Sequence, residues 1–314
     1  LLRQMAALQR WHKRQPPDQS IASWLDEQRV GEDWRAQFWR PMVLGALNTP
    51  LETASLRVLC HVLADGVWAS RNAGDFYIAK RNLSDTLAAP VLRYLAQHGA
   101  KYRPNCRIAQ VQAASGKVQA DGQTFDAAVF AVAPYHLAPL LPGHLGDAVR
   151  QAVQQLSYHA ITTVYLRYPQ PLHLPAALTG FAHRPTQWLL DRGRLQHPNE
   201  AAAIISTSDL VAESSLHTDG KPDWAATVHQ DLLQLNPHLP PPEAQQTITE
   251  KRATVASTVN RRLPDMADLN AARIWLAGDW LHDRYPATLE AAVQTGERAA
   301  QQCLAALTRT SGTR

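Results

Sequence analysis

The C-terminal part of this 314-residue chain decides its fold, and it reads RIWLAGDW at residues 273–280 and YPATLEAAV at residues 285–293. The uninterrupted apolar run from Ile274 to Ala277 is typical of a strand buried on both faces, as in a parallel sheet. Gly278 lets the backbone approach a ligand closely, because no Cβ intervenes. The helix expected from Glu290 to Leu307 presents unpaired amides and the positive end of its dipole at its start. The pattern predicts strand, loop and helix, which either hold an anionic or electron-rich ligand or simply pack together.

The first hundred residues show the spacing of amphipathic helices. Ser20 suits the start of one helix and Gly31 its end. Pro41 is expected to interrupt another helix, and Thr49 is expected to cap the start of a third. Gly99 suits the end of the last one. The predicted helices cover Met5–Trp11, Ser20–Gly31, Trp34–Leu47, Thr49–Leu63 and Ser84–His98.

After residue 100 the hydrophobic period changes from helical to alternating. Ser-Gly at 115–116 and Asp-Gly at 121–122 predict hairpin turns in a three-stranded meander. The apolar run 127–133 that follows predicts a strand buried on both faces. The meander strands are expected at 107–112, 117–120 and 124–126, further strands at 161–166, 187–190 and 203–207, and a helix at 224–235.

Composition excludes several classes of protein. Thirty-one basic and 27 acidic residues give a net charge of +4, but the arginines are scattered and form no stripe for nucleic acid. The three cysteines are far apart, which argues against a disulfide framework. The 13 histidines form no HxH or HExxH motif, so no metal site is expected. No apolar run approaches the ~20 residues that cross a membrane, although arginine could favour weak contact with anionic lipid headgroups.

The C-terminal residues quoted above, with Thr295 and Gly296, resemble the FAD motif of the flavin amine oxidase–phytoene desaturase superfamily. Within it, the chain is most similar to the squalene-associated FAD-dependent desaturases, or hydroxysqualene dehydroxylases. Residues 39–50 resemble the helical substrate region of that group, and residues 92–111 with 126–134 resemble its flavin-domain meander and returning strand. The resemblance therefore covers nearly the whole chain.

This resemblance implies FAD as the cofactor and assigns roles to particular positions. Gly278 and Asp279 match the glycine and acid near the FAD pyrophosphate and ribityl chain. Ile108 matches the strand residue whose backbone meets the adenine. The sheet-end turn that lines the dinucleotide corresponds to Ala133 and Pro134, and the loop and helix start below the isoalloxazine correspond to Pro286, Ala287, Thr288 and Leu289.

The implied fold is α/β (α+β overall): an FAD/NAD(P)-binding Rossmann-like domain interleaved with a helical plus antiparallel-sheet substrate domain. We expect a helical substrate-binding region at 1–100, the FAD-domain meander and sheet strand at 101–155, substrate-domain strands at 156–254 and the FAD-binding strand, loop and helix at 255–314. The superfamily begins with a GxGxxG unit, and the fifteen glycines include no GxG. We therefore expect the FAD domain to be N-terminally truncated, with that unit upstream of Leu1.

The resemblance further implies that reduced FAD delivers hydride to hydroxysqualene as its hydroxyl leaves, giving squalene for hopanoid or carotenoid synthesis. His282, Asp283 and Tyr285 are candidate proton donors, because they lie on the loop before the flavin helix. The implied partner is an isoprenoid lipid, and the location is cytoplasmic with possible peripheral contact at the inner face of a bacterial membrane. The oligomeric state is left open.

Three other functions remain open. One is a carotenoid desaturase of the phytoene type. Another is a flavin amine oxidase, although Thr288 stands where many amine oxidases have an aromatic residue. A relative that keeps the fold but acts only as a lipid-binding or escort module is the third.

Overall fold

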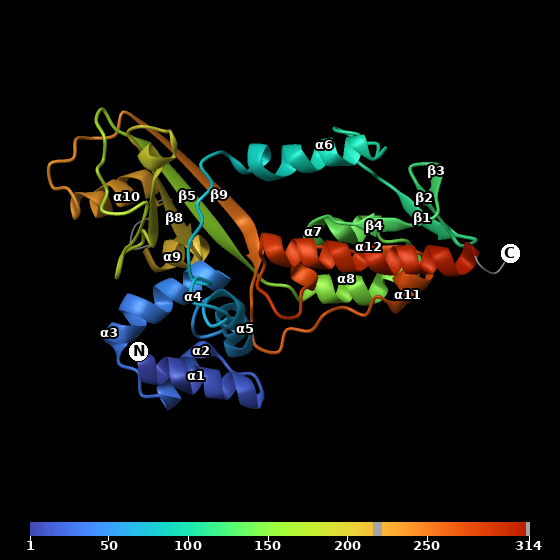
Figure 1. Cartoon of the computed structure of the whole chain (residues 1–314), viewed down its shortest axis with the longest axis horizontal. Coiled ribbons are helices and arrows are strands. Elements are labelled where there is room, and N and C mark those ends of the chain that lie inside the picture. The colour runs from blue at the N-terminus through green and yellow to red at the C-terminus, as the bar shows by residue number, and fades with distance from the viewer. Residues whose placement is uncertain (216–221, 312–314) are drawn as a thin grey trace.

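The computed structural model describes residues 1–215 and 222–311 of the chain. Figure 1 shows the N-terminal helices and an antiparallel sheet at one end of the long axis, and a part built around helix α12 (Leu289–Ser311) at the other. Separate clusters of buried side chains lie in these parts. None of the described helices is long and apolar enough to cross a membrane.

The N-terminal helices enclose an apolar core. Trp24 and Trp39 are fully buried there, and their rings meet edge to face at 5.6 Å between centroids. This geometry is the preferred one for aromatic pairs. The helices of this part are α1 (Leu2–Arg14), α2 (Ile21–Glu27), α3 (Glu32–Trp34), α4 (Arg40–Leu47) and α5 (Leu56–Gly66).

Two predicted helix boundaries in this region are wrong. Helix α2 ends at Glu27 rather than at Gly31, because Arg29 already takes a left-handed conformation (φ 52°) that ends a helix. Helix α5 begins after Ser55, whose Oγ accepts the amide of Val58 at 3.1 Å. Thr49 does not cap a helix; its Oγ1 donates to the carbonyl of Leu47 at 2.9 Å.

The prolines at 41 and 90 do not interrupt their helices. A five-residue π-helical turn precedes each of them, η1 (Arg35–Trp39) before α4 and η2 (Ser84–Ala88) before α6 (Ala89–Gln97). A π-turn inserts one residue into the helix and re-routes the bonds that a proline cannot make. The predicted helices over 34–47 and 84–98 are therefore each continuous, and Gly99 ends the second at φ 79°.

Helix α6 stands apart from the other helices in Figure 1. None of its residues is buried. Its Val91 and Tyr94, with Leu87 of the preceding η2, are apolar side chains that are 43–61% exposed.

The predicted meander is present as β1 (Val111–Ala114), β2 (Lys117–Ala120) and β3 (Gln123–Phe125), paired antiparallel in that order. The first strand begins later than residue 107, because the amides of Ala109 and Gln110 bond to the carboxylate of Asp121 instead. The expected buried strand over 127–133 shrinks to β4 (Ala128–Phe130), which is partly exposed. It pairs only with β10 (Ile274–Leu276), in parallel, so its other edge stays open in the described chain.

The antiparallel sheet has the strand order β6-β7-β8-β5-β9. Its predicted strands are confirmed as β5 (Tyr158–Arg167), β7 (Trp188–Asp191) and β8 (Glu200–Ser206), and the predicted helix as α10 (Trp224–Leu233). The sequence did not indicate β9 (Ala244–Val255), which is mostly polar and exposed and pairs with β5 along almost its whole length. Other unpredicted elements are β6 (Leu178–Gly180), α7 (Pro134–Leu137), α8 (Asp147–Gln154), α9 (Ser208–Ser215) and α11 (Ala267–Ala271).

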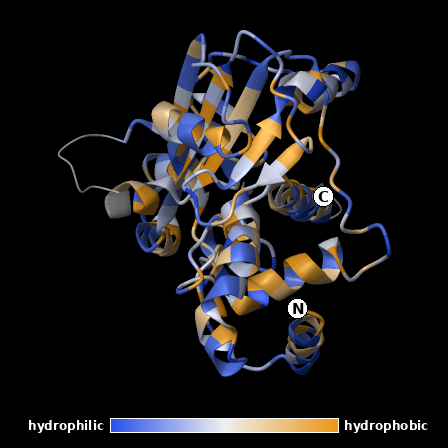
Figure 2. Ribbon diagram, turned by 90° about the vertical axis from the view of Figure 1, so that its left-hand side faces the viewer, coloured by the Kyte–Doolittle hydropathy of each residue, from blue (hydrophilic) through white to orange (hydrophobic). Residues whose placement is uncertain are grey.

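Figure 2 shows that the strands and the N-terminal helices each carry both hydrophobic and hydrophilic residues. In β5 the buried positions alternate with half-buried ones, so its buried face includes Val164 and Leu166. This face packs with α10, where Val228 and Leu232 are buried. The alternation is the pattern of a sheet with one covered face.

Candidate cofactor site

The two parallel strands bring their carboxyl ends to one edge of their sheet. Strand β10 pairs with β4 in register, Leu276 opposite Phe130, and the amide of Ala277 donates to the carbonyl of Phe130 at 2.8 Å. The segments that follow these strands are therefore neighbours: Ala133 and Pro134 after β4, and Gly278 after β10. Ligands of open α/β sheets bind at this edge. The structure thus brings two of the expected cofactor-binding segments together.

Gly278 is the position at this edge that no other residue could take. Its φ of 154° lies in the region that side chains disfavour, and a Cβ there would lie 2.8 Å from the ring of Trp280. Thr295 on α12 holds it from both sides: the amide of Gly278 donates to Thr295 Oγ1 at 3.1 Å, and that hydroxyl lies 3.0 Å from the carbonyl of Gly278. The strand end is therefore fixed to the helix.

Asp279 carries a carboxyl group that the fold partly buries, and burial raises its pKa. The amide of Trp280 and the positive charge of Arg261 oppose that rise. The guanidinium of Arg261 donates to the carbonyls of Trp280 and His282, both at 2.7 Å, and burial lowers its pKa. Sequence reasoning missed this role, since Arg261 lies outside the C-terminal motif and stood only among scattered arginines.

The start of α12 has the open apolar surface that a flat ring needs. Leu289 and Val293 are 59% and 61% exposed, and a Cβ on Gly296 would meet no atom within 4 Å. These three positions share one face of the helix. Thr288 Oγ1 accepts the amide of Ala291 at 3.2 Å and so caps the first turn. Small residues and an uncovered face here are compatible with a cofactor lying against the helix.

These residues fit a flavin dinucleotide. Helix α12, which carries the open face, is bonded to Gly278 through Thr295, and Gly278 follows a strand of the parallel pair. The indole Nε1 of Trp280 is a buried donor without a hydrogen-bond partner in the described chain. Ile108, the expected adenine contact, is 37% exposed just before β1. In Figure 1 the meander lies near the far end of α12, so an extended ligand would have to run along the helix to reach both places.

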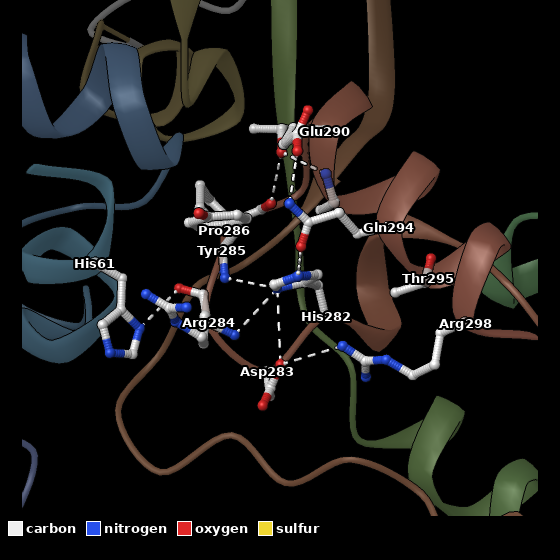
Figure 3. A network of polar contacts seen from close by, with 12 residues as sticks. His61, His282, Asp283, Arg284, Tyr285, Pro286, Glu290, Gln294, Thr295 and Arg298 are labelled. Carbon is white, nitrogen blue, oxygen red and sulfur yellow. Dashed lines mark hydrogen bonds and ion pairs between the residues drawn. The ribbon is translucent and has the colours of Figure 1, made fainter. Parts of the chain in front are cut away.

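The loop from His282 to Thr288 joins the sheet edge to α12, and it carries the three candidate proton donors (Figure 3). His282 is 2% exposed, and both of its ring nitrogens have partners within the chain. Asp283 is exposed and pairs with Arg298 at 3.9 Å. The three side chains lie close together but differ in their surroundings.

Tyr285 is tied to the N-terminal helices. Its hydroxyl donates to the carboxylate of Asp65 on α5, and this bond raises the pKa of the phenol. Arg284 also contacts Asp65, at 3.4 Å, and its carbonyl lies 3.2 Å from Nδ1 of His61. Figure 3 shows His61 approaching the loop from the side opposite α12. The loop therefore connects three parts of the chain.

A cavity of about 590 Å³ lies beside this loop. Its lining includes Arg57, Arg261, Arg262 and the carboxylates of Asp18 and Asp283. A charged lining of this kind does not suit a long hydrocarbon. We therefore place no isoprenoid chain in this cavity.

The chain matches a family model described as flavin containing amine oxidoreductase over residues 3–223 and 246–304. This match confirms the expectation of a flavin cofactor. Hydroxysqualene dehydroxylase from Rhodopseudomonas palustris is 29% identical over 276 residues, which cover 85% of this chain and 62% of that protein. Hydroxysqualene dehydroxylase from Sinorhizobium fredii is 24% identical over 279 residues, covering 84% and 61%. The chain thus spans about three fifths of the length of these curated relatives.

Solved structures share the fold at lower identity. An oxidoreductase from Methanosarcina mazei superposes with a TM-score of 0.65 at 12% identity, covering 95% of this chain and 71% of the other. Cyclohexylamine oxidase from Brevibacterium oxydans gives 0.59 at 14% identity, covering 92% and 68%. These likenesses confirm the expected mixed α/β class and show the fold alone.

Proposed function

The chain belongs to the flavin-containing amine oxidoreductase family, and from this premise we propose that the protein carrying it is an FAD-dependent hydroxysqualene dehydroxylase. The similarity to two relatives of that name supports the substrate. One structural observation supports the cofactor site: Gly278, clamped by Thr295, lies where two parallel strand ends meet the open start of α12. On this proposal the partner of the protein is a C30 isoprenoid lipid.

The reaction replaces a hydroxyl group by hydrogen. The C–O bond breaks, the hydroxyl leaves as water after it takes a proton, and a new C–H bond forms. Bound reduced FAD supplies the hydride. The residues of this chain fix the loop around Gly278, present the apolar face of α12 and supply the proton. We keep Asp283 and Tyr285 as candidate donors, whereas the two occupied nitrogens of His282 favour a positioning role.

We also propose the division of the chain that the resemblance implies, with flavin-domain pieces at 101–155 and 255–314 and substrate-domain pieces at 1–100 and 156–254. The separate buried clusters of the N-terminal helices, the antiparallel sheet and the C-terminal part support it. We place the protein in the cytoplasm. Because the substrate is insoluble in water, we also propose peripheral contact with the inner face of the membrane.

One observation counts against amine oxidation. Thr288 occupies the place of the aromatic residue that many amine oxidases use, and its hydroxyl is engaged at both ends. It accepts the amide of Ala291 and donates to the carbonyl of Pro286, each at 3.2 Å. It is therefore not free to contact an amine. A carotenoid desaturase and a lipid escort remain the alternatives for the experiment to separate.

The test is anaerobic incubation of the natural protein that carries this sequence with reduced FAD and hydroxysqualene, followed by extraction and mass analysis. We expect squalene in an amount equal to the FAD oxidised. Bound FAD without any squalene would exclude the proposed reaction and favour a desaturase, which incubation of the protein with oxidised FAD and phytoene would reveal. Protein that binds the lipid but no FAD would favour the escort function.

Gly278→Val tests the loop itself. The new Cβ would collide with Trp280 at a strained φ, so we expect the yellow flavin absorbance of the purified protein to be lost. Gly99→Val is the matched control, since Gly99 also has a positive φ but no atom within 4 Å of the added Cβ. Stoichiometric FAD in the Gly278 variant would contradict the assignment of this loop.

A further inference from the structure

His282 is a buried histidine whose protonation the surrounding bonds determine. Its Nδ1 accepts the backbone amides of Arg284 at 3.1 Å and Tyr285 at 3.0 Å. A nitrogen that accepts two N–H groups carries no proton. The other nitrogen, Nε2, lies 2.9 Å from Oε1 of Gln294 and must then be the donor. The network therefore assigns the neutral imidazole with its proton on Nε2.

The partner of Nε2 is itself fixed. The side-chain amide of Gln294 donates to Oε1 of Glu290 at 2.5 Å, one turn earlier on α12. This bond directs Oε1 of Gln294, an acceptor, at the histidine. The first two turns of α12 thus offer an acceptor to the N–H at Nε2. The loop backbone offers donors to the lone pair at Nδ1. One side chain joins the two elements through opposite hydrogen-bonding roles.

The surroundings hold the ring in this orientation. The imidazole stacks on the ring of Tyr285, with centroids 4.7 Å apart and planes 9° apart. The carbonyl of His282 accepts from Arg261 at 2.7 Å, which anchors the backbone from the segment before α11. Figure 3 shows the imidazole at the centre of these contacts, between the loop and the helix.

We propose that His282 is a positioning residue of the cofactor loop: its neutral imidazole brackets the 282–288 backbone to α12 and so sets where the loop and the helix start face the flavin. A histidine suits this position because its ring can accept hydrogen bonds on one side and donate one on the other, and no other side chain does so within one small ring. The flavin part of this inference rests on the proposed function; the bracket itself does not.

The charged groups near the ring have partners of their own. Asp283 Oδ1 lies 3.8 Å from Nδ1 of His282 and also pairs with Arg298. Arg261 bonds the backbone carbonyl of His282, and Glu290 reaches the ring only through Gln294.

The first measurement uses the unchanged chain. Long-range ¹H–¹⁵N spectra of the histidine rings at pH 7.5 should show His282 with its proton on Nε2. A proton on Nδ1, or rapid exchange between the two nitrogens, would overturn the proposal without any variant.

The second measurement is amide hydrogen exchange at residues 284 and 285 in the full chain. His282→Leu removes both bonds, and we expect the protection factors of these amides to fall about tenfold. His282→Asn keeps an acceptor at the place of Nδ1, so protection should stay near the original value. His229→Leu is the control, since His229 bonds Tyr168 in another part of the chain.

Unchanged protection in His282→Leu would overturn the proposal. In the flavin-loaded natural protein, we expect His282→Leu to weaken FAD binding and His282→Asn to restore most of it. Loss of amide protection at residues 284 and 285 with unchanged FAD affinity would uphold the role of His282 between the loop and α12. It would contradict the proposed flavin contact of the loop. The role of His282 and the proposed flavin contact can therefore be refuted separately.

Discussion

Asp279 is a carboxylate that the fold keeps at an electrostatic cost. It follows Gly278 at the sheet edge, where burial raises its pKa and the charge of Arg261 only partly offsets the effect. A raised pKa means that the folded state binds the proton more readily than the unfolded chain does. The charged form at neutral pH therefore lowers stability. A residue that costs stability at a cofactor edge is typical of function.

Asp279→Asn should raise the urea midpoint of the chain at pH 7, because the amide keeps the acceptor and removes the partly buried charge. The advantage should shrink as the pH falls toward the ordinary value of the carboxyl group, where the original side chain becomes protonated. Asp126→Asn is the control: its carboxylate is exposed and bonded to Lys117, which lowers its pKa, so this variant should gain nothing. A less stable Asp279→Asn at pH 7 would contradict this account.

At the scale of elements, one hydroxyl bonds α12 to the strand edge, beside the packing of Ala299 against Trp275 and Ala277. Thr295 is 4% exposed and contacts both the amide and the carbonyl of Gly278. The loop bracket of His282 lies one position earlier on the helix, through Gln294. Two adjacent residues therefore hold the strand end and the loop. These contacts add to the packing of the inner face of α12, where Ala291 is fully buried, whereas the outer face at Leu289 and Val293 is uncovered.

Thr295→Val should lower the free energy of unfolding by about 1–3 kcal/mol, since it leaves the amide of Gly278 without its acceptor. Urea denaturation followed by circular dichroism measures the change. Thr308→Val on the same helix is the matched control: Thr308 is exposed and its hydroxyl donates only to carbonyls of its own helix. Its effect should stay within about 0.5 kcal/mol, and equal losses for the two variants would show that no clamp exists.

At the scale of the whole molecule, Asn48 joins the N-terminal helices to the antiparallel sheet. It ends α4 in the left-handed conformation, φ 44°, and is 5% exposed. Its side-chain amide donates to Thr254 Oγ1 at 2.8 Å, and its Oδ1 accepts the amide of Thr207 at 2.8 Å. Next to it, Thr49 Oγ1 accepts the amide of Ser257 at 3.0 Å. The junction is therefore polar, and its bonds span about 160–210 residues of sequence.

Asn48→Ala should cost about 2–4 kcal/mol, because it strands two buried polar groups and places alanine at a positive φ. Asn105→Ala isolates the backbone part of this cost. Asn105 has φ 58° and is exposed, so its loss should be about 1 kcal/mol. Chemical denaturation of both variants gives the difference, and similar losses would mean that the side chain of Asn48 contributes nothing to the junction.

How much of the fold could be predicted from the sequence depends on whether nearby or distant residues determine each element. The meander, the strand before Gly278 and helix α12 were predicted correctly, since hydrophobic period and turn glycines determine them within a few residues. The end of α2 near Arg29 and the start of α5 after Ser55 were not predicted correctly, because another residue nearby gives an equally good signal for a helix boundary. Strand β9 was missed because its exposed residues carry no apolar alternation; only its pairing with β5 makes it a strand.

The sequence by itself predicted the class of the protein, because the apolar run, the turn glycine and the helix start between Ile274 and Val293 are local signals. It also predicted which residues line the proposed cofactor edge. Only the tertiary structure decided what holds that edge: Arg261 on two carbonyls, Thr295 on Gly278, and His282 with one proton and two roles. A hydrogen bond needs both partners within about 3 Å, and which distant residues come so close is decided when the chain folds.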